Sequence, residues 1–250
     1  MRAMVLAAGM GSRLRPLTLH RPKALVEVGG HTMLEITLRR LANFGIREIV
    51  VNAHHHAEMI VDYLAENDFF GLSIEVSIEP ELLDTGGGLQ KAAPMLLAGG
   101  YDGPILVHNV DILSNVDFEA MRAAHERSGA WATLAVKPRP SKRQLFFDAQ
   151  NALCGWQQAD GSVQWARQAE ATTPLAFCGL HIVAPQLIAS LTEQNAFSII
   201  PAYLKLASEG KQVIAYRADA SYWRDLGKPE SVAAAAQDLA TVPGLSPFAE

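Results

Sequence analysis

The chain has 250 residues and a formal net charge of −5; 49% of its residues are hydrophobic and 19% are charged. This composition supports one continuous apolar core, and a single α/β domain of this size is common, so extended disorder is excluded. The acidic balance, with a pI near 5.9, excludes the broad basic face of a duplex nucleic-acid binder.

Two cysteines, Cys154 and Cys178, are too few for a disulfide framework, so each is expected to be a small buried residue. The apolar run at the N-terminus is short and broken by glycines, unlike a signal peptide or a membrane span. We therefore expect a cytoplasmic protein that has neither a membrane nor a nucleic acid as partner.

The first half of the chain alternates predicted strands and helices. Residues 49–51 are consecutive β-branched residues, typical of a strand buried on both faces, and leucines at helical spacing mark residues 32–44 as a helix. The predicted strands are 2–7, 48–52, 72–78 and 104–109, and the predicted helices are 32–44, 57–67, 87–98 and 118–128. This alternation predicts a mostly parallel sheet with helices on both faces.

The second half is richer in strands. Strands are predicted at 131–137, 144–148, 152–157, 174–183 and 212–216, and helices at 185–191, 198–208 and 230–239. We expect an α/β fold, a Rossmann-like three-layer sandwich with a mostly parallel central sheet and a small substrate-facing lobe. Residues 1–239 would form one domain and residues 240–250 a C-terminal tail. No β-helix repeat is visible, so a trimer built on one is not expected, and the oligomeric state stays open.

A glycine turn follows the first strand, in the run L-A-A-G-M-G-S-R-L-R-P-L-T at residues 6–18. Glycines allow backbone N–H groups to approach phosphate oxygens. The dinucleotide fingerprint is incomplete, because Leu14 stands where its third glycine belongs, and no lysine follows as in a Walker A loop. Four cations follow the turn: Arg13, Arg15, Arg21 and Lys23. An anion would relieve their mutual repulsion, so the segment predicts a small anionic ligand.

Together with the R-P-K at residues 21–23, this run resembles the signature of the sugar-phosphate nucleotidyltransferases, the NDP-sugar pyrophosphorylases. The likeness continues in E-L-L-D-T-G-G-G at 81–88, V-H-N-V-D at 107–111 and W-R-D-L-G at 223–227. Within the family, Ala7–Ala8 and the T-G-G-G run are most similar to the uridylyltransferases that act on N-acetylmuramate 1-phosphate. Guanylyltransferases more often have glycine in place of Ala8, and the family usually has glycine in place of Val110.

The resemblance implies that the chain joins a nucleoside triphosphate to a sugar 1-phosphate, with Mg²⁺ as cofactor, and releases pyrophosphate and an NDP-sugar. It assigns nucleotide binding to Leu6, Ala7, Ala8, Gly9, Gly11, Ser12, Arg13, Lys23, Gly86 and Gly87. It assigns the sugar phosphate to Asn109, Phe177, Gly179 and Asp225. It makes Arg13, Lys23 and Asp111 the catalytic residues, and Asp111 and Asp225 the Mg²⁺ ligands.

Asp111 also stands out without the resemblance. It follows a buried apolar strand, so its carboxylate is expected at the carboxyl edge of the sheet, where open α/β sheets bind ligands. Mg²⁺ prefers carboxylate and phosphate oxygens. Alternatively, Asp111 could cap a helix and Asp225 could cap a turn or form a salt bridge. A phosphate monoester is already largely dianionic at neutral pH, so positioning and charge neutralisation would suffice for catalysis.

Three other functions are open to the sequence. One is guanylyl or another nucleotidyl transfer to a mannose- or heptose-type 1-phosphate. An NAD-dependent oxidoreductase is disfavoured by the missing third glycine and by Glu27, which does not follow a second strand as the fingerprint requires. A non-catalytic nucleotide-sugar sensor should have lost Asp111, Asp225 or Lys23, and all three are present.

Several other residues have a plainer interpretation. Three adjacent histidines, His54 to His56, cannot share one face, so we expect a surface loop, although His54 or Asn52 could touch the sugar. Glu79 and Glu81 could recognise a base edge or be surface charges. Trp156 and Trp165 are expected to be packing residues. The basic loop at residues 137–143 is either solvated or gates the sugar site.

Overall fold

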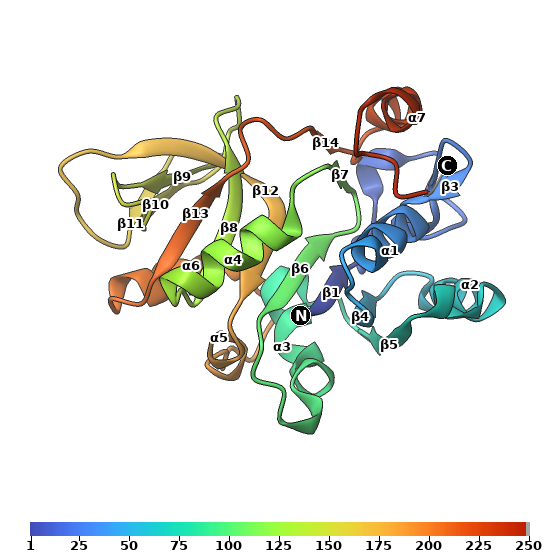
Figure 1. Ribbon diagram of the computed structural model, residues 1–250, viewed down its shortest axis with the longest axis horizontal. Helices are drawn as coiled ribbons and strands as arrows, with labels where there is room; N and C mark the ends of the chain where they lie inside the picture. Colours follow the sequence, from blue (N-terminus) through green and yellow to red (C-terminus); the bar gives the residue numbers. More distant parts are fainter. Residues whose placement is uncertain (249–250) are drawn as a thin grey trace.

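The ten-stranded mixed sheet is the centre of the molecule, and helices cover both of its faces (Figure 1). The computed structural model describes residues 1–248. Along its main path the sheet has the strand order β11-β10-β9-β12-β6-β1-β4-β5, and β8 pairs with both β12 and β13. The candidate site lies where the four parallel strands at one end of this sheet meet β12, which pairs antiparallel with β6.

The parallel half consists of β1 (Arg2–Leu6), β4 (Glu48–Ala53), β5 (Ser73–Ile78) and β6 (Ile105–Asn109). Its strands are linked by α1 (Met33–Asn43), α2 (Ala57–Glu66) and α3 (Asp84–Leu96), and α4 (Phe118–Ser128) follows. β1 and β4 are buried along almost their whole length, as a strand covered on both faces must be. The Thr32 side chain caps α1 by accepting the Glu35 N–H at 3.0 Å, which fixes where this helix begins.

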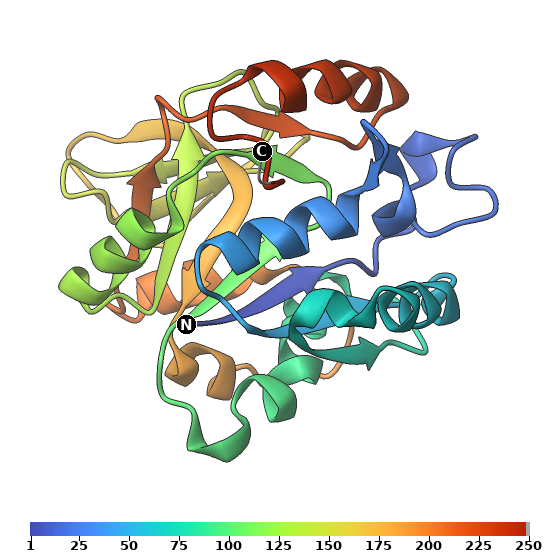
Figure 2. The ribbon, with the colours of Figure 1, turned by 45° about the vertical axis from the view of Figure 1, so that its right-hand side comes forward.

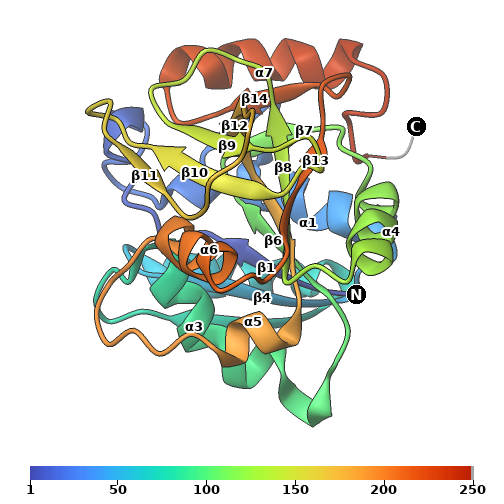
Figure 3. The same ribbon diagram turned by 90° about the vertical axis from the view of Figure 1, so that its left-hand side faces the viewer.

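The lobe is built from the second half of the chain (Figure 3). Its strands are β8 (Ala132–Lys137), β9 (Gln144–Phe147), β10 (Leu153–Gln157), β11 (Val163–Trp165), β12 (Thr173–Val183) and β13 (Val213–Arg217), and its helices are α5 (Pro185–Ala189) and α6 (Ile199–Ser208). β12 is the joint between the halves, because it pairs antiparallel with β6 at one end and with β9 at the other.

Several short elements have no counterpart in the sequence prediction. They are β2 (Glu27–Val28), β3 (His31–Thr32), β7 (Ile112–Ser114), β11, β14 (Trp223–Asp225) and the 3-10 helices at residues 12–14, 23–25, 68–71 and 98–100. Elements of two to four residues are too short to show a periodicity. β14 pairs antiparallel with β7 in a separate two-stranded sheet, and this pairing shapes the site.

Two apolar clusters separate the layers, as expected for a three-layer sandwich. One lies under α1, α2, α4 and α7 (Pro229–Thr241), and the other lies under α3, α5 and α6 (Figure 2). The predicted α/β class, with parallel strands at its centre, is confirmed. The antiparallel pairs all lie on the lobe side of β6 or within the small sheets.

Most helix ends lie within two residues of the prediction, and two of the differences affect the site and the C-terminal region. α3 begins at Asp84 instead of residue 87, so its first turns contain the glycine run. α7 ends at Thr241, and Leu245 beyond it is fully buried. Arg40 and Asn43 also donate hydrogen bonds to the carbonyls of residues 244 and 247. Residues 249–250 of the predicted tail lie outside the described residues.

Both cysteines are free and buried, as predicted. Trp156 packs half-buried against the lobe core, but the packing prediction for Trp165 is wrong in part. One face of this indole lies against Phe146, with ring centroids 4.9 Å apart, while 53% of the residue is exposed because β11 is the outermost strand. Among residues 1–248, no helix has both the length and the apolarity that crossing a membrane requires.

Candidate active site

A cavity of about 360 Å³ opens at the carboxyl ends of β1, β4 and β6, the expected edge for a ligand in this fold. It is lined by Leu6, Ala8, Gly9, Lys23, Asn52, Leu82, Asp84, Thr85, Asn109, Asp111 and Ala196. Six of these residues are predicted site residues: Leu6, Ala8, Gly9, Lys23, Asn109 and Asp111. A larger hollow of about 520 Å³ has no predicted site residue in its lining. It is lined by Pro16, Leu17, His20, Arg21, Val26, Glu27 and Val232.

The glycine loop after β1 is held by side chains from elsewhere. The buried Asn52 at the end of β4 accepts the Ala7 N–H through its Oδ1 at 2.7 Å. Gly11 has a φ of 60°, a left-handed conformation that favours glycine, and its carbonyl accepts the Thr18 hydroxyl at 2.8 Å. Ser12 and Arg13 follow on an exposed 3-10 helix. The loop is therefore fixed at both ends and exposes its polar side chains between them.

Lys23 and Asp111 meet inside the cavity. Lys23 Nζ lies 2.9 Å from Asp111 Oδ2, and each side chain is 13% exposed. Val110 is 1% exposed, belongs to the apolar core and does not line the cavity, so the valine at the family's glycine position does not narrow it. Lys23 and Asp111 thus place a cation and a carboxylate side by side in the cavity, an arrangement suited to a phosphate ligand and a divalent cation.

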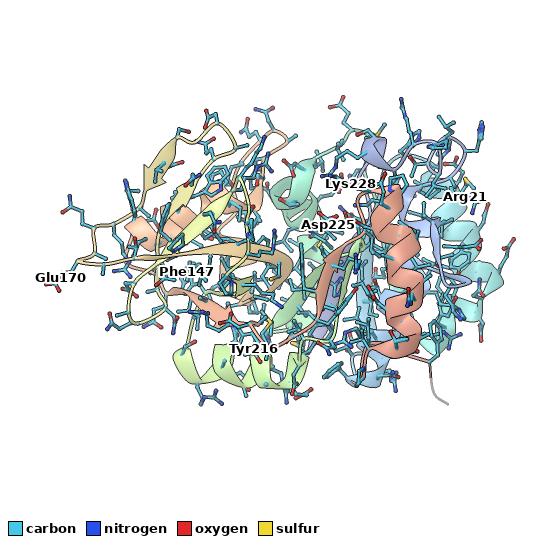
Figure 4. The ribbon with its side chains drawn as sticks, turned by 90° about the horizontal axis from the view of Figure 1, so that it is seen from above. Arg21, Phe147, Glu170, Tyr216, Asp225 and Lys228 are labelled. Atoms are coloured by element: carbon cyan, nitrogen blue, oxygen red, sulfur yellow. The ribbon has the colours of Figure 1, made fainter. Side chains whose placement is uncertain are left out.

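Asp225 reaches the same edge from far along the chain. In the pairing of β14 with β7, Asp225 lies opposite Ile112, and the Leu226 N–H donates to the Asp111 carbonyl at 2.8 Å. The two predicted metal ligands therefore belong to adjoining segments. Figure 4 labels Asp225 near the middle of the molecule, between the lobe that carries Phe147 and the loop that carries Arg21.

Arg13 lies beside Asp225. A side-chain carbon placed on Gly227 would be 2.7 Å from Asp225 Oδ1 and 2.9 Å from Arg13 Nη2, so both groups border this glycine. The Asp225 carboxylate also accepts the Gly227 N–H at 2.7 Å. Arg13, Lys23, Asp111 and Asp225 are therefore gathered around the end of β6 and the strand pair that follows it.

The donor set matches Mg²⁺ better than a structural metal. Asp111 and Asp225 offer carboxylate oxygens from adjoining segments, and Mg²⁺ is commonly bound by one or two carboxylates together with substrate phosphates. Within residues 1–248, no group of three or more His, Cys, Asp or Glu side chains is placed to hold a metal ion.

Gly86 and Gly87 do not line the cavity. Their N–H groups donate to the Phe197 carbonyl at 2.9 and 3.3 Å, and the Phe197 N–H donates back to the Leu83 carbonyl at 3.1 Å. The amides that the resemblance assigned to the nucleobase therefore already have an acceptor, in the segment before α6. Their neighbours Leu82, Asp84 and Thr85 face the cavity instead.

Of the residues predicted for the sugar, Asn109 lines the cavity and Gly179 lies behind it. A side-chain carbon on Gly179 would be 2.9 Å from Asn109 Nδ2. The Phe177 ring is stacked on His181 with centroids 5.4 Å apart. The pairing of β12 with β8 shifts register between Phe177 and His181, so this part of β12 bulges.

Burial changes the pKa of three groups close to these strands. It lowers the pKa of His108 to about 4 and that of His181 to about 3, because a charged imidazole would be desolvated in the core. Burial also raises the pKa of the Cys178 thiol to about 12. Both histidines are therefore neutral at pH 7 and Cys178 is an unreactive thiol.

The structure excludes one of the two interpretations that the sequence left open for Glu79, base recognition and surface charge. The surface-charge interpretation is wrong for this residue, which is 2% exposed, whereas Glu81 is exposed. Glu79 accepts the Asn52 amide at 2.6 Å and the Leu83 N–H at 3.0 Å. His54 Nδ1 lies 2.8 Å from the Glu79 carbonyl. The three histidines form the predicted loop, between β4 and α2, and are half-buried there.

Four cavity residues were missed altogether. Leu82, Asp84 and Thr85 belong to the E-L-L-D-T-G-G-G run, so the motif itself was the signal that could have found them. Ala196 lies in a loop that carries no local signal, and only the tertiary structure places it at the cavity.

Comparison with known proteins agrees with this geometry. Residues 2–147, more than half of the chain, match the family model described as nucleotidyl transferase. The chain is 33% identical over 247 residues to an N-acetylmuramate alpha-1-phosphate uridylyltransferase of Caulobacter vibrioides, covering 95% of this chain and 96% of that protein. It is 31% identical to a mannose-1-phosphate guanyltransferase of Debaryomyces hansenii, covering 92% of this chain but 62% of the longer yeast protein.

Two solved structures share the fold. A putative glucose-1-phosphate thymidylyltransferase from Bacillus anthracis superposes with a TM-score of 0.80 at 16% identity, covering 100% of this chain and 98% of that one. HddC from Yersinia pseudotuberculosis, complexed with GMP-PN, superposes with a TM-score of 0.73 at 20% identity, covering 95% and 98%. With the extent of the family match and the uridylyltransferase relative, these findings show that the chain belongs to the nucleotidyl transferase family, as a sugar-phosphate nucleotidyltransferase.

Proposed function

We propose that the chain transfers the uridylyl group of UTP to N-acetylmuramate 1-phosphate, giving the UDP-sugar and pyrophosphate. The observation that carries the transfer chemistry is the Lys23–Asp111 pair inside the cavity, with Asp225 on the adjoining segment. The choice of substrates rests on the uridylyltransferase relative, which is matched over nearly its whole length.

The chain's own residues would act mainly by positioning and charge. A phosphate oxygen of the sugar 1-phosphate attacks the α-phosphorus of UTP, and the bond from that phosphorus to the bridging oxygen of the pyrophosphate breaks. Lys23 would hold the attacking phosphate or the α-phosphate, and Arg13 would neutralise the departing pyrophosphate. Because the attacking group is already an anion, no side chain needs to remove a proton.

We also propose that Asp111 and Asp225 hold Mg²⁺. We expect the protein to act in the cytoplasm. When bound there, Mg²⁺ would neutralise negative charge on the nucleotide phosphates. Removal of divalent cations with EDTA is therefore expected to abolish turnover, and added Mg²⁺ to restore it. Turnover that survives complete chelation would contradict the metal assignment.

A second candidate is guanylyl transfer to a mannose-type 1-phosphate. It is favoured by the 31% identical guanyltransferase and by a neighbouring structure that contains a guanine nucleotide analogue. The two candidates share the phosphate chemistry and differ only in what occupies the base and sugar ends of the cavity.

The decisive experiment measures pyrophosphate release with UTP, GTP, CTP and dTTP, each paired with the 1-phosphates of N-acetylmuramate, N-acetylglucosamine, mannose and glucose. We expect UTP with N-acetylmuramate 1-phosphate to give the highest kcat/KM. A higher value for GTP with mannose 1-phosphate would favour the second candidate, and no release with any pair would refute both.

A further inference from the structure

Two cations of the basic loop at residues 137–143, Lys137 and Arg139, are half-buried instead of fully solvated. Arg139 is half-buried, and its Nη2 donates to the Phe177 carbonyl at 2.9 Å. Its guanidinium carbon lies 4.0 Å from the centroid of the Trp223 ring, an aromatic face that attracts cations. Its Nε is buried and has no hydrogen-bond partner within residues 1–248. Arg139 therefore lies half-buried between the lobe and β14.

Trp223 completes the connection from the other side. Its indole Nε1 donates to the Cys178 carbonyl at 2.8 Å. We call Arg139, Phe177, Cys178 and Trp223 the Arg139 clamp. Lys137, at the end of β8, also donates to the Ser221 carbonyl just before β14. The loop after β8, the bulged part of β12 and the start of β14 are thus tied together by side chains.

The Arg139 clamp matters for the position of β14, because β14 is not part of the ten-stranded sheet. β14 pairs only with the short β7, so the large sheet does not fix its position directly. Asp225 is two residues beyond Trp223 on this strand. A shift of Trp223 would therefore move the Asp225 carboxylate relative to Asp111. Burial lowers the pKa of the Arg139 guanidinium, and the negative charge of Asp225 acts in the opposite direction.

We propose that Arg139 is a positioning residue, which fixes Trp223, and through it Asp225, against the backbone of Phe177 and Cys178. The proposal goes beyond the transfer reaction, because it assigns to the basic loop the task of joining the lobe to the metal-binding strand. Its kinetic consequences rest on the proposed transfer reaction, whereas its effect on metal binding rests only on the assignment of Asp225 as a metal ligand.

Only an arginine performs both parts of this contact. The planar guanidinium stacks on the indole while one of its edges donates to a carbonyl. A lysine could make one contact or the other, because its ammonium is a point charge on a flexible stem. Arg143 in the same loop is exposed and provides a matched control.

The test compares Arg139→Met and Arg139→Lys with Arg143→Met in the full-length chain. Mn²⁺, used as a spectroscopic substitute for Mg²⁺, is titrated by electron paramagnetic resonance in the presence of α,β-methylene UTP, and separately of α,β-methylene GTP. We expect Arg139→Met to weaken Mn²⁺ binding by about ten- to a hundredfold, the range typical of groups that orient metal ligands. Arg139→Lys should recover only part of the loss, and Arg143→Met should bind like the parent chain.

Kinetics and stability separate positioning from a general structural role. In the turnover assay, Arg139→Met should raise the Mg²⁺ concentration needed for half-maximal activity by the same factor, while the thermal midpoint of Arg139→Lys stays close to that of the parent. Trp223→Phe keeps an aromatic ring but loses the hydrogen bond to the Cys178 carbonyl. It is the second variant if Arg139→Met does not fold, and it should also weaken Mn²⁺ binding.

The proposal is overturned if folded Arg139→Met binds Mn²⁺ as tightly as the parent chain. If Arg139→Met does not fold, unchanged Mn²⁺ affinity in folded Arg139→Lys and Trp223→Phe overturns it instead. An equal loss in Arg143→Met would do so too. If the parent chain turns over no sugar 1-phosphate, the proposed function fails, but the Mn²⁺ comparison still decides the role of Arg139.

Discussion

At the scale of single residues, the site depends on buried polar groups that satisfy one another. Asn52 and Glu79 are each 2% exposed, and a buried carboxylate or amide is tolerated only when it is hydrogen-bonded. Their bonds run from the Ala7 N–H through Asn52 to Glu79 and on to the Leu83 N–H. The glycine loop and the start of α3 are therefore positioned by the same two side chains.

Gly88 provides a test of this pair. A side-chain carbon there would lie 2.7 Å from both Asn52 Nδ2 and Glu79 Oε1, too close without displacing them. We expect Gly88→Ala to destabilise the fold by about 1–3 kcal/mol and to raise the KM for the nucleoside triphosphate. If the clash with Asn52 is the cause, urea unfolding will show a smaller cost in an Asn52→Ala background. Equal costs in both backgrounds would count against this explanation.

Asp111 gives the sharpest prediction for catalysis. Asp111→Asn keeps the size of the side chain but removes the negative charge next to Lys23. Loss of a charge that acts directly on the reacting phosphates is expected to lower kcat/KM by about a hundredfold or more, while circular dichroism shows an unchanged fold. Near-normal turnover in the pyrophosphate assay would refute the metal assignment.

At the scale of elements, α7 supports β14 from the side opposite the lobe. Arg224 of β14 forms an ion pair with Asp238 of α7 at 2.7 Å and donates to the Tyr222 hydroxyl at 2.7 Å. The Tyr222 hydroxyl in turn donates to Asp238. Successive residues of this short strand therefore face different partners, with Arg224 bound to α7 and Trp223 bound to the lobe.

Asp238→Asn should loosen this support. Since both side chains are partly exposed, the expected loss of stability is only about 1 kcal/mol or less, but Mg²⁺ should bind less tightly because the strand carrying Asp225 is less constrained. Asp219→Asn removes the same charge from an exposed pair with Arg217 and serves as the control. The Mg²⁺ dependence of turnover should differ between the two variants; identical curves would contradict the role of α7.

At the scale of the whole molecule, the two core clusters enclose His108 and His181 as neutral groups. Unfolded histidine has a pKa of about 6.5, whereas burial lowers the pKa of these two to about 4 and about 3. As the pH falls below 6.5, the unfolded chain gains protons that the folded chain does not. Their contribution to stability is therefore complete above pH 6.5 and is lost as the pH falls toward 4 and 3.

Urea unfolding at pH 7 and pH 5 tests this linkage. Each histidine should cost about 2 kcal/mol of unfolding free energy between pH 7 and pH 5, because one pH unit corresponds to about 1.4 kcal/mol per proton taken up by the unfolded chain alone. His181→Phe removes one such histidine from a site between the Phe177 and Tyr203 rings. Between pH 7 and pH 5 this variant should therefore lose less unfolding free energy than the parent chain, by about the cost of one histidine. An unchanged pH dependence would show that His181 does not carry the effect.

The sequence by itself determined the fold class and most of the glycine loop at the cavity. Leu6, Gly9 and Lys23 lie close together along the chain, and the periodicity of buried strands placed Asp111 at the carboxyl edge of the sheet. These features are local, because glycine geometry, strand burial and motif spacing act over a few residues.

Only the tertiary structure decided how distant segments meet. The pairing of Asp225 opposite Ile112, the burial of Glu79 beneath the glycine loop, the capping of Gly86 and Gly87 by Phe197, and the inward turn of Arg139 each join residues far apart in the chain. Such contacts involve elements of two or three residues or single side chains. They leave no periodic signal in the sequence, because packing and hydrogen-bond satisfaction across the whole fold select them.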